Sequence, residues 1–326
     1  KQQQQNLHSE NVKWINDLKN INSFPTIFLA NEFFDAMPIK QFFKRQENWF
    51  ERFVDINNYS LIDVNKIEQA INEKTKAIIP VHLYGQMCEM DKIMELANKY
   101  NLKVIEDCAQ SHGATYKEKK AGSIGHVGCF SFYPTKILGA YGDGGCITTN
   151  DEYIHDKMKR IRFLGMEKKK NSSDHWNGKY YALEHGMNSR LDEVHAAILL
   201  KKLKYLDKWI VRRREIAAKY DKELKNTTLQ IPVERNDNKH AYYVYVVSHP
   251  NRNEIMINLA KKDIHLNIIY PFPIHIMEAY KHFVSNPCTH LKKTEEESKK
   301  IFSLPIYPTL TDEEQNSVIR ELKKLI

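Results

Sequence analysis

Residues 76–105 constrain the fold most, because they combine two short apolar runs with an amphipathic stretch between them. Residues 76–81 (KAIIPV) and 102–105 predict buried strands. Residues 89–100 carry apolar side chains at positions 90, 93, 94 and 96, which is the spacing of an amphipathic helix. A strand, a helix and a strand in so short a segment form a βαβ unit. We therefore expect parallel strands joined by a right-handed crossover.

The pattern after this unit predicts a larger α/β domain followed by a smaller α+β domain. Helical spacing from Leu191 to Ile210, with a continuation to Tyr220, predicts one long helix that bridges the two. The remaining predicted strands cover residues 127–132, 146–149 and 240–247, and the remaining predicted helices cover residues 254–262 and 312–325.

Composition excludes several classes of protein. No run reaches the 18 apolar residues of a membrane span, and the polar first residues have no apolar signal core, so we expect a cytoplasmic protein without a membrane partner. The five cysteines contain no C-x-x-C pair, which argues against a disulfide framework and against a zinc ribbon, so we expect no metal site. The net charge is +8, but the lysines are spread over helix-like stretches, so we expect no nucleic-acid partner.

Glycine is concentrated in one region. Of the 12 glycines, seven lie between Gly122 and Gly145, and none precedes Gly85. Backbone that approaches a phosphate closely usually needs glycine. We therefore expect any phosphate-binding turn near residues 122–145 and no glycine-rich nucleotide loop in the first 84 residues.

Two reactive side chains follow predicted strands. Asp107 ends the strand 102–106 within EDCAQSHGA, and Lys136 follows the strand 127–132 within SFYPTKILGAYGDGG. Ligands of open α/β sheets bind at the carboxyl ends of strands, so the two side chains form a candidate site. The alternative is that Asp107 is a capping residue and Lys136 an ordinary surface lysine. Spacing alone favours this alternative.

Four sequence blocks resemble the DegT/StrS family of sugar aminotransferases, which are fold-type I enzymes that use pyridoxal 5′-phosphate (PLP). The blocks are PVHLYGQ (80–86), EDCAQSHGA (106–114), SFYPTKILGAYGDGG (131–145) and HGMNSRLDEVHAAIL (185–199). YPFPIH (270–275) and SLPIYPTLTDEE (303–314) are similar too. The resemblance runs from about Phe53 to the C-terminus. It implies the fold-type I large domain, with a mainly parallel sheet and helices on both faces, and a smaller C-terminal domain.

The resemblance assigns roles to four residues of the large domain. Lys136 matches the catalytic lysine that forms a Schiff base with the cofactor, and Asp107 matches the carboxylate beside the ring nitrogen. Gln110 matches a family residue that contacts the cofactor near its ring hydroxyl. Ser131 matches a phosphate ligand, although an ordinary strand-end hydroxyl is the alternative.

Two further residues imply a homodimer. Asn188 matches the family's asparagine that reaches the partner subunit's cofactor phosphate, and Arg190 lies beside it. N-S-R-L-D-E before an apolar run is also a helix-capping pattern, and both roles are compatible.

The resemblance also implies a substrate class. Family members that carry histidine in place of Lys136 are dehydratases, so the lysine favours transamination. The expected substrate is a keto nucleotide-sugar, dTDP- or UDP-linked, for surface polysaccharide, with glutamate as amino donor. Two departures concern substrate handling: Ile137 replaces the usual asparagine, and Ile269 replaces the usual histidine.

The N-terminal part departs from the family. Residues 1–53 contain no glycine and no S-G-T turn of the kind that binds the cofactor phosphate. Residues 25–54, which include a predicted strand pair near 39–43 and 49–54, resemble a fragment of SAM-dependent methyltransferases of the complex I assembly type. The resulting prediction is a foreign segment (1–53), a truncated PLP-binding domain (54–205) and a small domain (206–326).

Two alternatives to an active aminotransferase follow from this departure. The first is an inactive remnant or pseudoenzyme of the family, produced by gene fusion, because the phosphate loop is missing. The second is a methyltransferase-like interaction module, which the lack of a glycine-rich SAM loop makes the weaker alternative.

Overall fold

The computed structural model describes residues 40–45, 48–53, 62–166, 181–280 and 291–326. In the first two ranges, β1 (Lys40–Arg45) and β2 (Asn48–Phe53) pair antiparallel, with Lys40 opposite Phe53. The strand pair predicted near this position is therefore confirmed. Most of the segment with methyltransferase resemblance lies outside the described residues.

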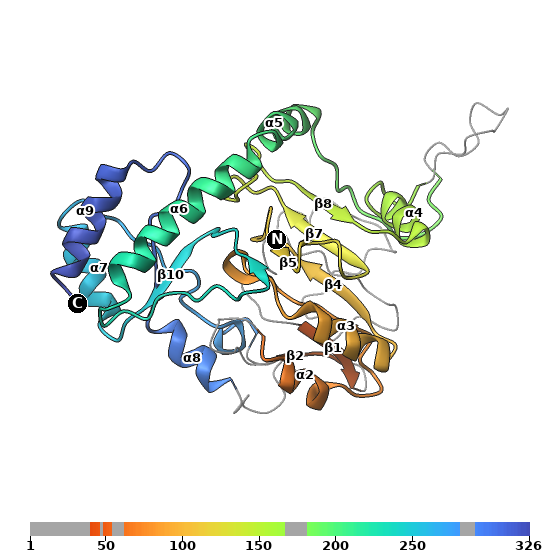
Figure 1. The fold of residues 1–326 in the computed structure, drawn as a ribbon. Coiled ribbons are helices and arrows are strands. Elements are labelled where there is room, and N and C mark those ends of the chain that lie inside the picture. Colours follow the sequence, from red (N-terminus) through yellow and green to blue (C-terminus); the bar gives the residue numbers. More distant parts are fainter. Residues whose placement is uncertain (1–39, 46–47, 54–61, 167–180, 281–290) are drawn as a thin grey trace, which may run out of the picture.

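The central sheet has the strand order β3-β4-β7-β8 within the described residues. β3 (Ala77–Ile78), β4 (Lys103–Asp107) and β7 (Val127–Ser131) are parallel, and β8 (Gly145–Thr148) joins β7 antiparallel. The helix α3 (Met90–Lys99) connects β3 to β4, so the predicted βαβ unit is confirmed (Figure 1). The parallel register brings the carboxyl ends of β4 and β7 to the same edge.

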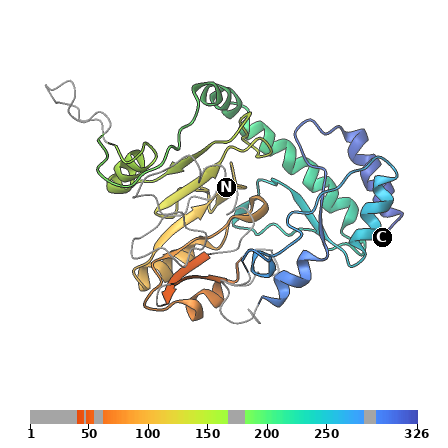
Figure 2. The same ribbon diagram turned by 180° about the vertical axis from the view of Figure 1, so that it is seen from behind.

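The main core lies between this sheet and two helices. Ile93 of α3 is fully buried, as is Ile67 of α2 (Val64–Ala70), and both belong to one cluster with Ile78 and Val104 of the strands. Figure 2 shows the two helices side by side below the sheet. The i, i+3 and i+4 spacing of the apolar residues of α3 places them on the face that meets the sheet.

The single long helix predicted from residue 191 is wrong, because the structure has two. α5 (Glu193–Leu203) ends before Lys204, and α6 (Leu206–Leu224) begins after Tyr205. The Tyr205 N–H donates to the carbonyl of Lys202 at 2.9 Å, a tight i−3 turn that redirects the chain. The break allows α5 and α6 to bury different faces: Leu199 packs with Phe132, Leu138 and Ala140, whereas Ile210 joins the main core.

The helix α6 joins two cores. Its first half contributes Ile210 to the main core, and its second half contributes Ile216 and Tyr220 to a second cluster. That cluster contains α7 (Arg252–Ala260), α9 (Asp312–Lys323) and the antiparallel pair β10 (Tyr245–Ser248) and β11 (Ile301–Leu304). Figure 1 shows α6 running diagonally across the molecule toward these elements.

Four further helices and a small sheet complete the described fold. The helices are η3 (Leu83–Gly85), α4 (Glu152–Ile161), η4 (Ile274–Ile276) and α8 (Lys292–Ser298). The small antiparallel sheet has the order β6-β5-β9 and consists of β5 (Thr115–Tyr116), β6 (Lys119–Lys120) and β9 (Asn238–Lys239).

The strand predicted over residues 240–247 is correct only from Tyr245. The chain before it makes its main-chain hydrogen bonds with the turn at Tyr84 and Gly85. Ala241 N–H donates to Gly85 O at 2.9 Å, and Tyr243 N–H donates to Tyr84 O at 3.0 Å. The apolar run of residues 241–243 therefore reflects burial against the turn and not pairing in a sheet.

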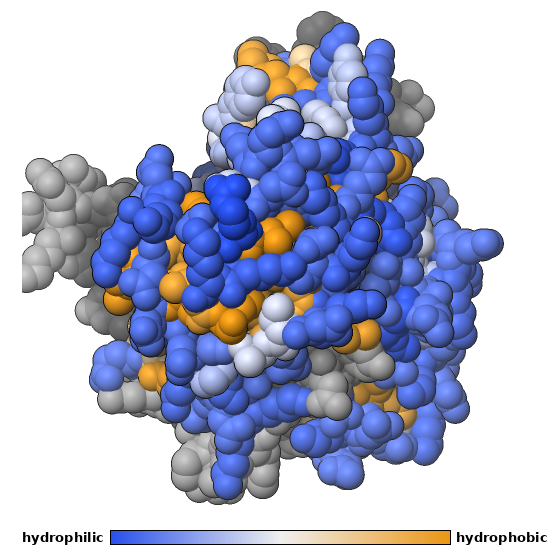
Figure 3. All heavy atoms as spheres, turned by 60° about the vertical axis from the view of Figure 1, so that its left-hand side comes forward, coloured by the Kyte–Doolittle hydropathy of each residue, from blue (hydrophilic) through white to orange (hydrophobic). Residues whose placement is uncertain are grey.

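The surface is mainly hydrophilic on the side of α7 and α9, with apolar side chains gathered at its centre and at the top, over α5 (Figure 3). On α5, Val194, Leu200 and Leu203 are at least half exposed. Among the described residues, the helices are all too short or too polar to cross a membrane.

We predict that the folded state loses stability as the pH falls below about 6.5. Burial lowers the pKa of His112 to about 4 and the pKa of His240 to about 3, from an ordinary value of 6.5. Below pH 6.5 the unfolded chain binds protons that the folded state does not bind. Each histidine should then remove about 1.4 kcal/mol of unfolding free energy per pH unit until its folded pKa is reached. Urea unfolding at pH 7.5, 6 and 5 measures this loss.

The variant His112→Phe provides the control. The His112 ring packs against Phe130, with ring centroids 5.4 Å apart, so another aromatic ring suits the site. Its slope of stability against pH should be shallower by about 1.4 kcal/mol per unit between pH 6.5 and 4.5. An unchanged slope would contradict the assignment of this pH dependence to His112.

Candidate active site

Asp107 stands at the carboxyl end of β4, where the sheet fixes its backbone on both sides. It lies opposite Cys129 of the neighbouring strand, two residues before β7 ends at Ser131. Its N–H donates to Pro80 O at 2.9 Å, and its carbonyl accepts from His82 N–H at 3.1 Å. The side chain is only 5% exposed, and Oδ1 accepts from the Ala109 N–H at 3.1 Å. The result is a buried carboxylate with a fixed direction.

Lys136 lies on the turn that follows β7. Its N–H donates to Tyr133 O at 2.9 Å, and Ala140 N–H closes the turn on Phe132 O at 2.7 Å. The next two side chains anchor the turn in separate cores, Ile137 in the main core and Leu138 in the cluster under α5. This anchoring explains why Lys136, at 6% exposed, is not the surface lysine of the alternative interpretation.

A tyrosine from a distant segment lies under this lysine. The Nζ of Lys136 lies 5.0 Å from the ring centroid of Tyr243, a cation–π geometry, and the Tyr243 hydroxyl lies 3.3 Å from Thr135 Oγ1. The pKa of Tyr270 is raised, first by burial and then by Tyr243, Tyr84 and Asp107. The Tyr270 hydroxyl therefore remains protonated at neutral pH.

Gln110 is held from two sides. The Tyr84 N–H donates to its Oε1 at 2.6 Å, and its Nε2 donates to the Tyr270 hydroxyl at 3.0 Å. Because the backbone N–H can only donate, this contact fixes which end of the amide is the oxygen. The structure thus brings Asp107, Gln110 and the Lys136 turn, with Tyr243 and Tyr270, into one group at the carboxyl ends of β4 and β7. We call it the strand-end group.

The other predicted residues lie differently. Ser131 is half-buried at the end of β7, and its Oγ accepts from the Tyr133 N–H at 3.3 Å. Asn188 and Arg190 are exposed between α4 and α5, where the Arg190 guanidinium stacks 5.1 Å from the ring of Phe163. Within one subunit, the described structure does not bring these two residues into the strand-end group.

Sequence patterns missed Tyr84, Tyr243 and Tyr270 as site residues. Tyr270 lies in the YPFPIH block and Tyr84 in PVHLYGQ, so both blocks carried the signal, whereas Tyr243 lay in a segment predicted to be a strand.

Glu106, next to Asp107, organises the backbone beneath this group. Oε1 accepts from the N–H groups of Ile124 and Gly125 at 2.7 and 2.6 Å, and Oε2 accepts from Gly122 N–H and from His82 Nε2, each at 2.9 Å. Burial by itself raises the pKa of Glu106, but the bonds from His82, Gly125 and Gly122 hold it below its ordinary value. A charged carboxylate therefore links three segments: the one at His82, β4 itself and the turn at residues 122–125.

Glu106, His82 and Cys108 place possible metal-ligand atoms within 4.8 Å of one another. Hydrogen bonds already occupy His82 and Glu106. His82 Nδ1 accepts from Cys88 N–H at 3.3 Å, and His82 Nε2 donates to Glu106. Burial raises the pKa of the Cys108 thiol well above its ordinary value, which disfavours the thiolate that binds metals. His82 and Glu106 therefore act as a hydrogen-bonded pair, with Cys108 beside them.

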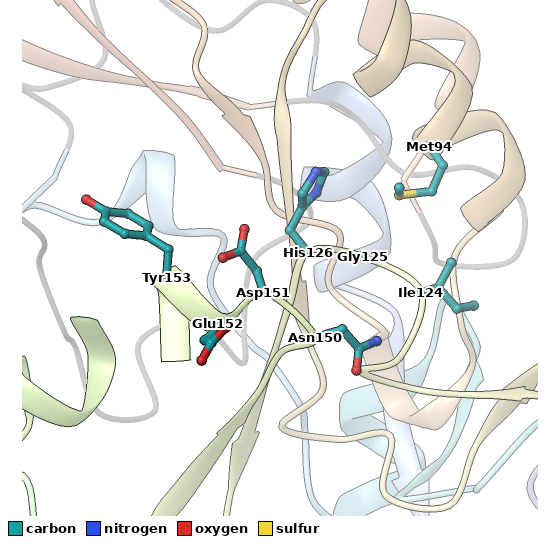
Figure 4. Close-up of a pocket in the computed structure, with 8 residues that line it drawn as sticks. All are labelled: Met94, Ile124, Gly125, His126, Asn150, Asp151, Glu152 and Tyr153. Atoms are coloured by element: carbon teal, nitrogen blue, oxygen red, sulfur yellow. The ribbon is translucent and has the colours of Figure 1, made fainter. Parts of the chain in front are cut away.

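A cavity of about 580 Å³ lies elsewhere, at the start of β7 and of α4 (Figure 4). Its lining includes His126, Asp151 and Tyr153. His126 precedes β7, whereas Ser131 ends it, so this cavity and the strand-end group lie at opposite ends of that strand.

Comparison with known proteins identifies the family. The model of the DegT/DnrJ/EryC1/StrS aminotransferase family matches residues 49–323. The chain belongs to this family. It is 43% identical over 281 residues to a dTDP-3-amino-3,4,6-trideoxy-alpha-D-glucose transaminase of Micromonospora megalomicea subsp. nigra, covering 84% of this chain and 72% of the relative. It is 44% identical over 270 residues to a dTDP-3-amino-3,6-dideoxy-alpha-D-galactopyranose transaminase of Aneurinibacillus thermoaerophilus, covering 83% and 70%.

Solved structures agree with this assignment. A family aminotransferase from Brucella abortus has a TM-score of 0.77 and 34% identity, covering 84% of this chain and 72% of its own. The structure of S. venezuelae DesV in complex with a ketimine intermediate has a TM-score of 0.78 and 34% identity, with 84% and 71% covered. The fold-type I architecture expected from the sequence is therefore confirmed.

The family points to PLP as cofactor, and the residues present fit it. The strand-end group combines a buried carboxylate, an amide with a fixed orientation and a buried lysine amine. These match a protonated pyridine ring, a ring hydroxyl and an aldehyde in turn. Gly139 lets the Lys136 turn close, because a Cβ there would lie 2.5 Å from Pro134 O.

We predict that Glu106→Ala strongly destabilises the protein. The substitution leaves three backbone N–H groups and His82 without their acceptor, and losing one side of a buried ionic network costs about 3–5 kcal/mol. The free energy of unfolding, from urea titration, measures the loss.

Glu68→Ala is the matched control. Glu68 pairs with Lys99 at 2.6 Å on the surface, where such pairs contribute about 1 kcal/mol or less. Equal losses in the two variants would show that the Glu106 network does not support the core.

Proposed function

We propose that this protein is a PLP-dependent aminotransferase that aminates a keto nucleotide-sugar, dTDP- or UDP-linked, with glutamate as amino donor. The observation that carries the proposal is the buried Lys136 on the turn after β7, at the sheet edge where Asp107 ends β4. The names of the family relatives, which are nucleotide-sugar transaminases, support the substrate class. A role in surface polysaccharide synthesis in the cytoplasm is part of the same proposal.

The bound cofactor would supply an electron sink for the carbon that exchanges its amino group. Asp107 would hold the proton on the ring nitrogen, since a carboxylate beside it favours the charged ring. The burial of Asp107 strengthens this interaction, because water does not screen it.

Lys136 would play two parts. Its Nζ would hold the cofactor aldehyde in the resting enzyme and, once released, would move the proton between the donor or sugar carbon and the cofactor. The Tyr243 ring beneath Nζ would keep the released amine close to the site. Ile137 and Leu138 anchor the backbone of the turn in two cores, so that only the lysine side chain would move.

Binding of the cofactor phosphate would involve two subunits. Ser131 offers a hydroxyl from the end of β7, and Asn188 with Arg190 would reach the phosphate of the partner subunit. Their exposed position away from the strand-end group supports this arrangement, as does the exposed apolar face of α5, which suits a second copy of the chain.

The division into segments 1–53, 54–205 and 206–326 stays a proposal. The sharing of α6 between two cores supports a boundary near residue 206. The methyltransferase resemblance of residues 25–54 also stays a prediction. The aminotransferase relatives favour neither the pseudoenzyme nor the interaction module.

We predict that PLP attaches to Lys136. Borohydride reduction of the protein with added PLP should fix the cofactor to one peptide, identified by mass spectrometry, and the visible absorbance of the bound cofactor should vanish in Lys136→Ala. Lys201→Ala, which removes an exposed lysine of α5, should retain both. Label on another lysine, with Lys136→Ala unaffected, would refute the assignment.

We predict that two inactive variants restore activity when mixed. In a dimer of Lys136→Ala with Asn188→Ala, one site carries both defects and the other carries none, because Asn188 acts across the interface. Random mixing should then recover about a quarter of wild-type activity after subunit exchange. If Asn188 serves its own subunit, every site stays defective and the mixture remains inactive. Light scattering of the wild type checks that the protein is a dimer.

A further inference from the structure

Tyr84 contacts three segments that are far apart in the sequence. Its N–H donates to Gln110 Oε1 at 2.6 Å, its carbonyl accepts from Tyr243 N–H at 3.0 Å, and its hydroxyl donates to Ile269 O at 2.7 Å. One residue thus uses its backbone donor, its backbone acceptor and its side chain on three different partners. Each of these segments carries a side chain of the strand-end group.

The backbone at this point is shaped for close approach. Tyr84 has a φ of +60°, and the next residue, Gly85, has a φ of +103°. A Cβ on Gly85 would lie 3.1 Å from the N atoms of Tyr242 and Tyr243 and 3.2 Å from Gln110 O. The left-handed turn therefore lets the 110 and 243 segments meet at Tyr84.

The three contacts also determine the chemistry that the segments present. The Tyr84 N–H holds the oxygen of the Gln110 amide, so Nε2 points to the Tyr270 hydroxyl and the amide offers a donor on that side. The Tyr84 carbonyl holds the backbone of Tyr243, whose ring lies under the Lys136 amine. The Tyr84 hydroxyl holds Ile269, and thereby places Tyr270.

We propose that Tyr84 is a positioning residue. It couples residues 269–270 of the C-terminal part to Gln110 and to Tyr243, whose ring lies under the Lys136 amine. The coupling toward the cofactor rests on the proposed function, whereas the coupling among the segments does not. In a protein whose site forms between two cores, such a link makes the orientation of Gln110 and Tyr243 depend on the placement of the 269–270 segment.

Amide hydrogen exchange on the protein without added cofactor tests the coupling. Tyr84→Phe removes only the bond to Ile269 O. The N–H groups of Tyr84 and Tyr243, whose own partners are retained, should nevertheless exchange about five- to tenfold faster, together with residues 267–272, because the turn loses its anchor.

Tyr220→Phe is the matched control. It also removes a buried tyrosine hydroxyl bonded to a main-chain carbonyl, that of Pro305 at 3.0 Å, but in the second core. It should leave exchange near residues 82–86 and 241–243 unchanged. If Tyr84→Phe accelerates only residues 267–272, or if Tyr220→Phe has the same effect near 82–86, the coupling is refuted.

Tyr270→Phe gives an independent variant, which removes the bond from Gln110 Nε2 while Tyr84 stays intact. It should accelerate exchange of the Tyr84 N–H, and an unchanged rate would also count against the coupling.

The spectrum of the bound cofactor gives a readout that a loss of stability alone would not move. After addition of PLP, Tyr84→Phe and Tyr270→Phe should shift the ratio of the near-ultraviolet and visible absorption bands, and Tyr220→Phe should not. A wild type that shows no visible band would refute the proposed function, whereas the exchange data would still decide the role of Tyr84. A normal wild-type band with unchanged ratios in both variants would refute the coupling toward the cofactor.

Discussion

The carboxylate of Glu106 is the interaction on which the site depends most. It accepts three backbone N–H groups from the turn at residues 122–125 and the ring Nε2–H of His82, all at 2.6–2.9 Å. These bonds fix the entry into β7 and the segment that leads to Tyr84, while Glu106 itself precedes Asp107. Because the carboxylate and His82 are buried, its loss leaves the His82 ring donor without a partner in the core.

The Lys136 turn shows how packing prepares a reactive side chain. A lysine amine is strongly hydrated and normally stays in water, yet this one is 6% exposed. The neighbouring Ile137 and Leu138 insert into two different cores, so the turn has little freedom to move the lysine outward. Ile137, which departs from the family pattern, thus has a structural use: it adds apolar surface to the main core.

The sequence predicted the elements whose pattern is local. The spacing of apolar residues in 89–100 was sufficient for α3, and the runs beside it were sufficient for β3 and β4. Burial of one helix face leaves a periodic pattern, and burial of a central strand leaves a short continuous apolar run. The break at Lys204 and Tyr205 left no such signature, since both sides of it are helical and apolar. The strand prediction for residues 240–243 was wrong for a related reason. Burial against a turn produces the same apolar pattern as burial in a sheet.

The sequence by itself determined the βαβ unit, the two strand ends that carry Asp107 and the Lys136 turn, and the family to which the chain belongs. Only the tertiary structure decided that Lys136 is buried, that Gln110 points its oxygen to Tyr84, and that Tyr243 and Tyr270 join the site. The physical reason is sequence distance. Hydrogen-bond partners 26 and 160 residues apart leave no periodicity in the chain, and they meet only after two cores have packed around α6.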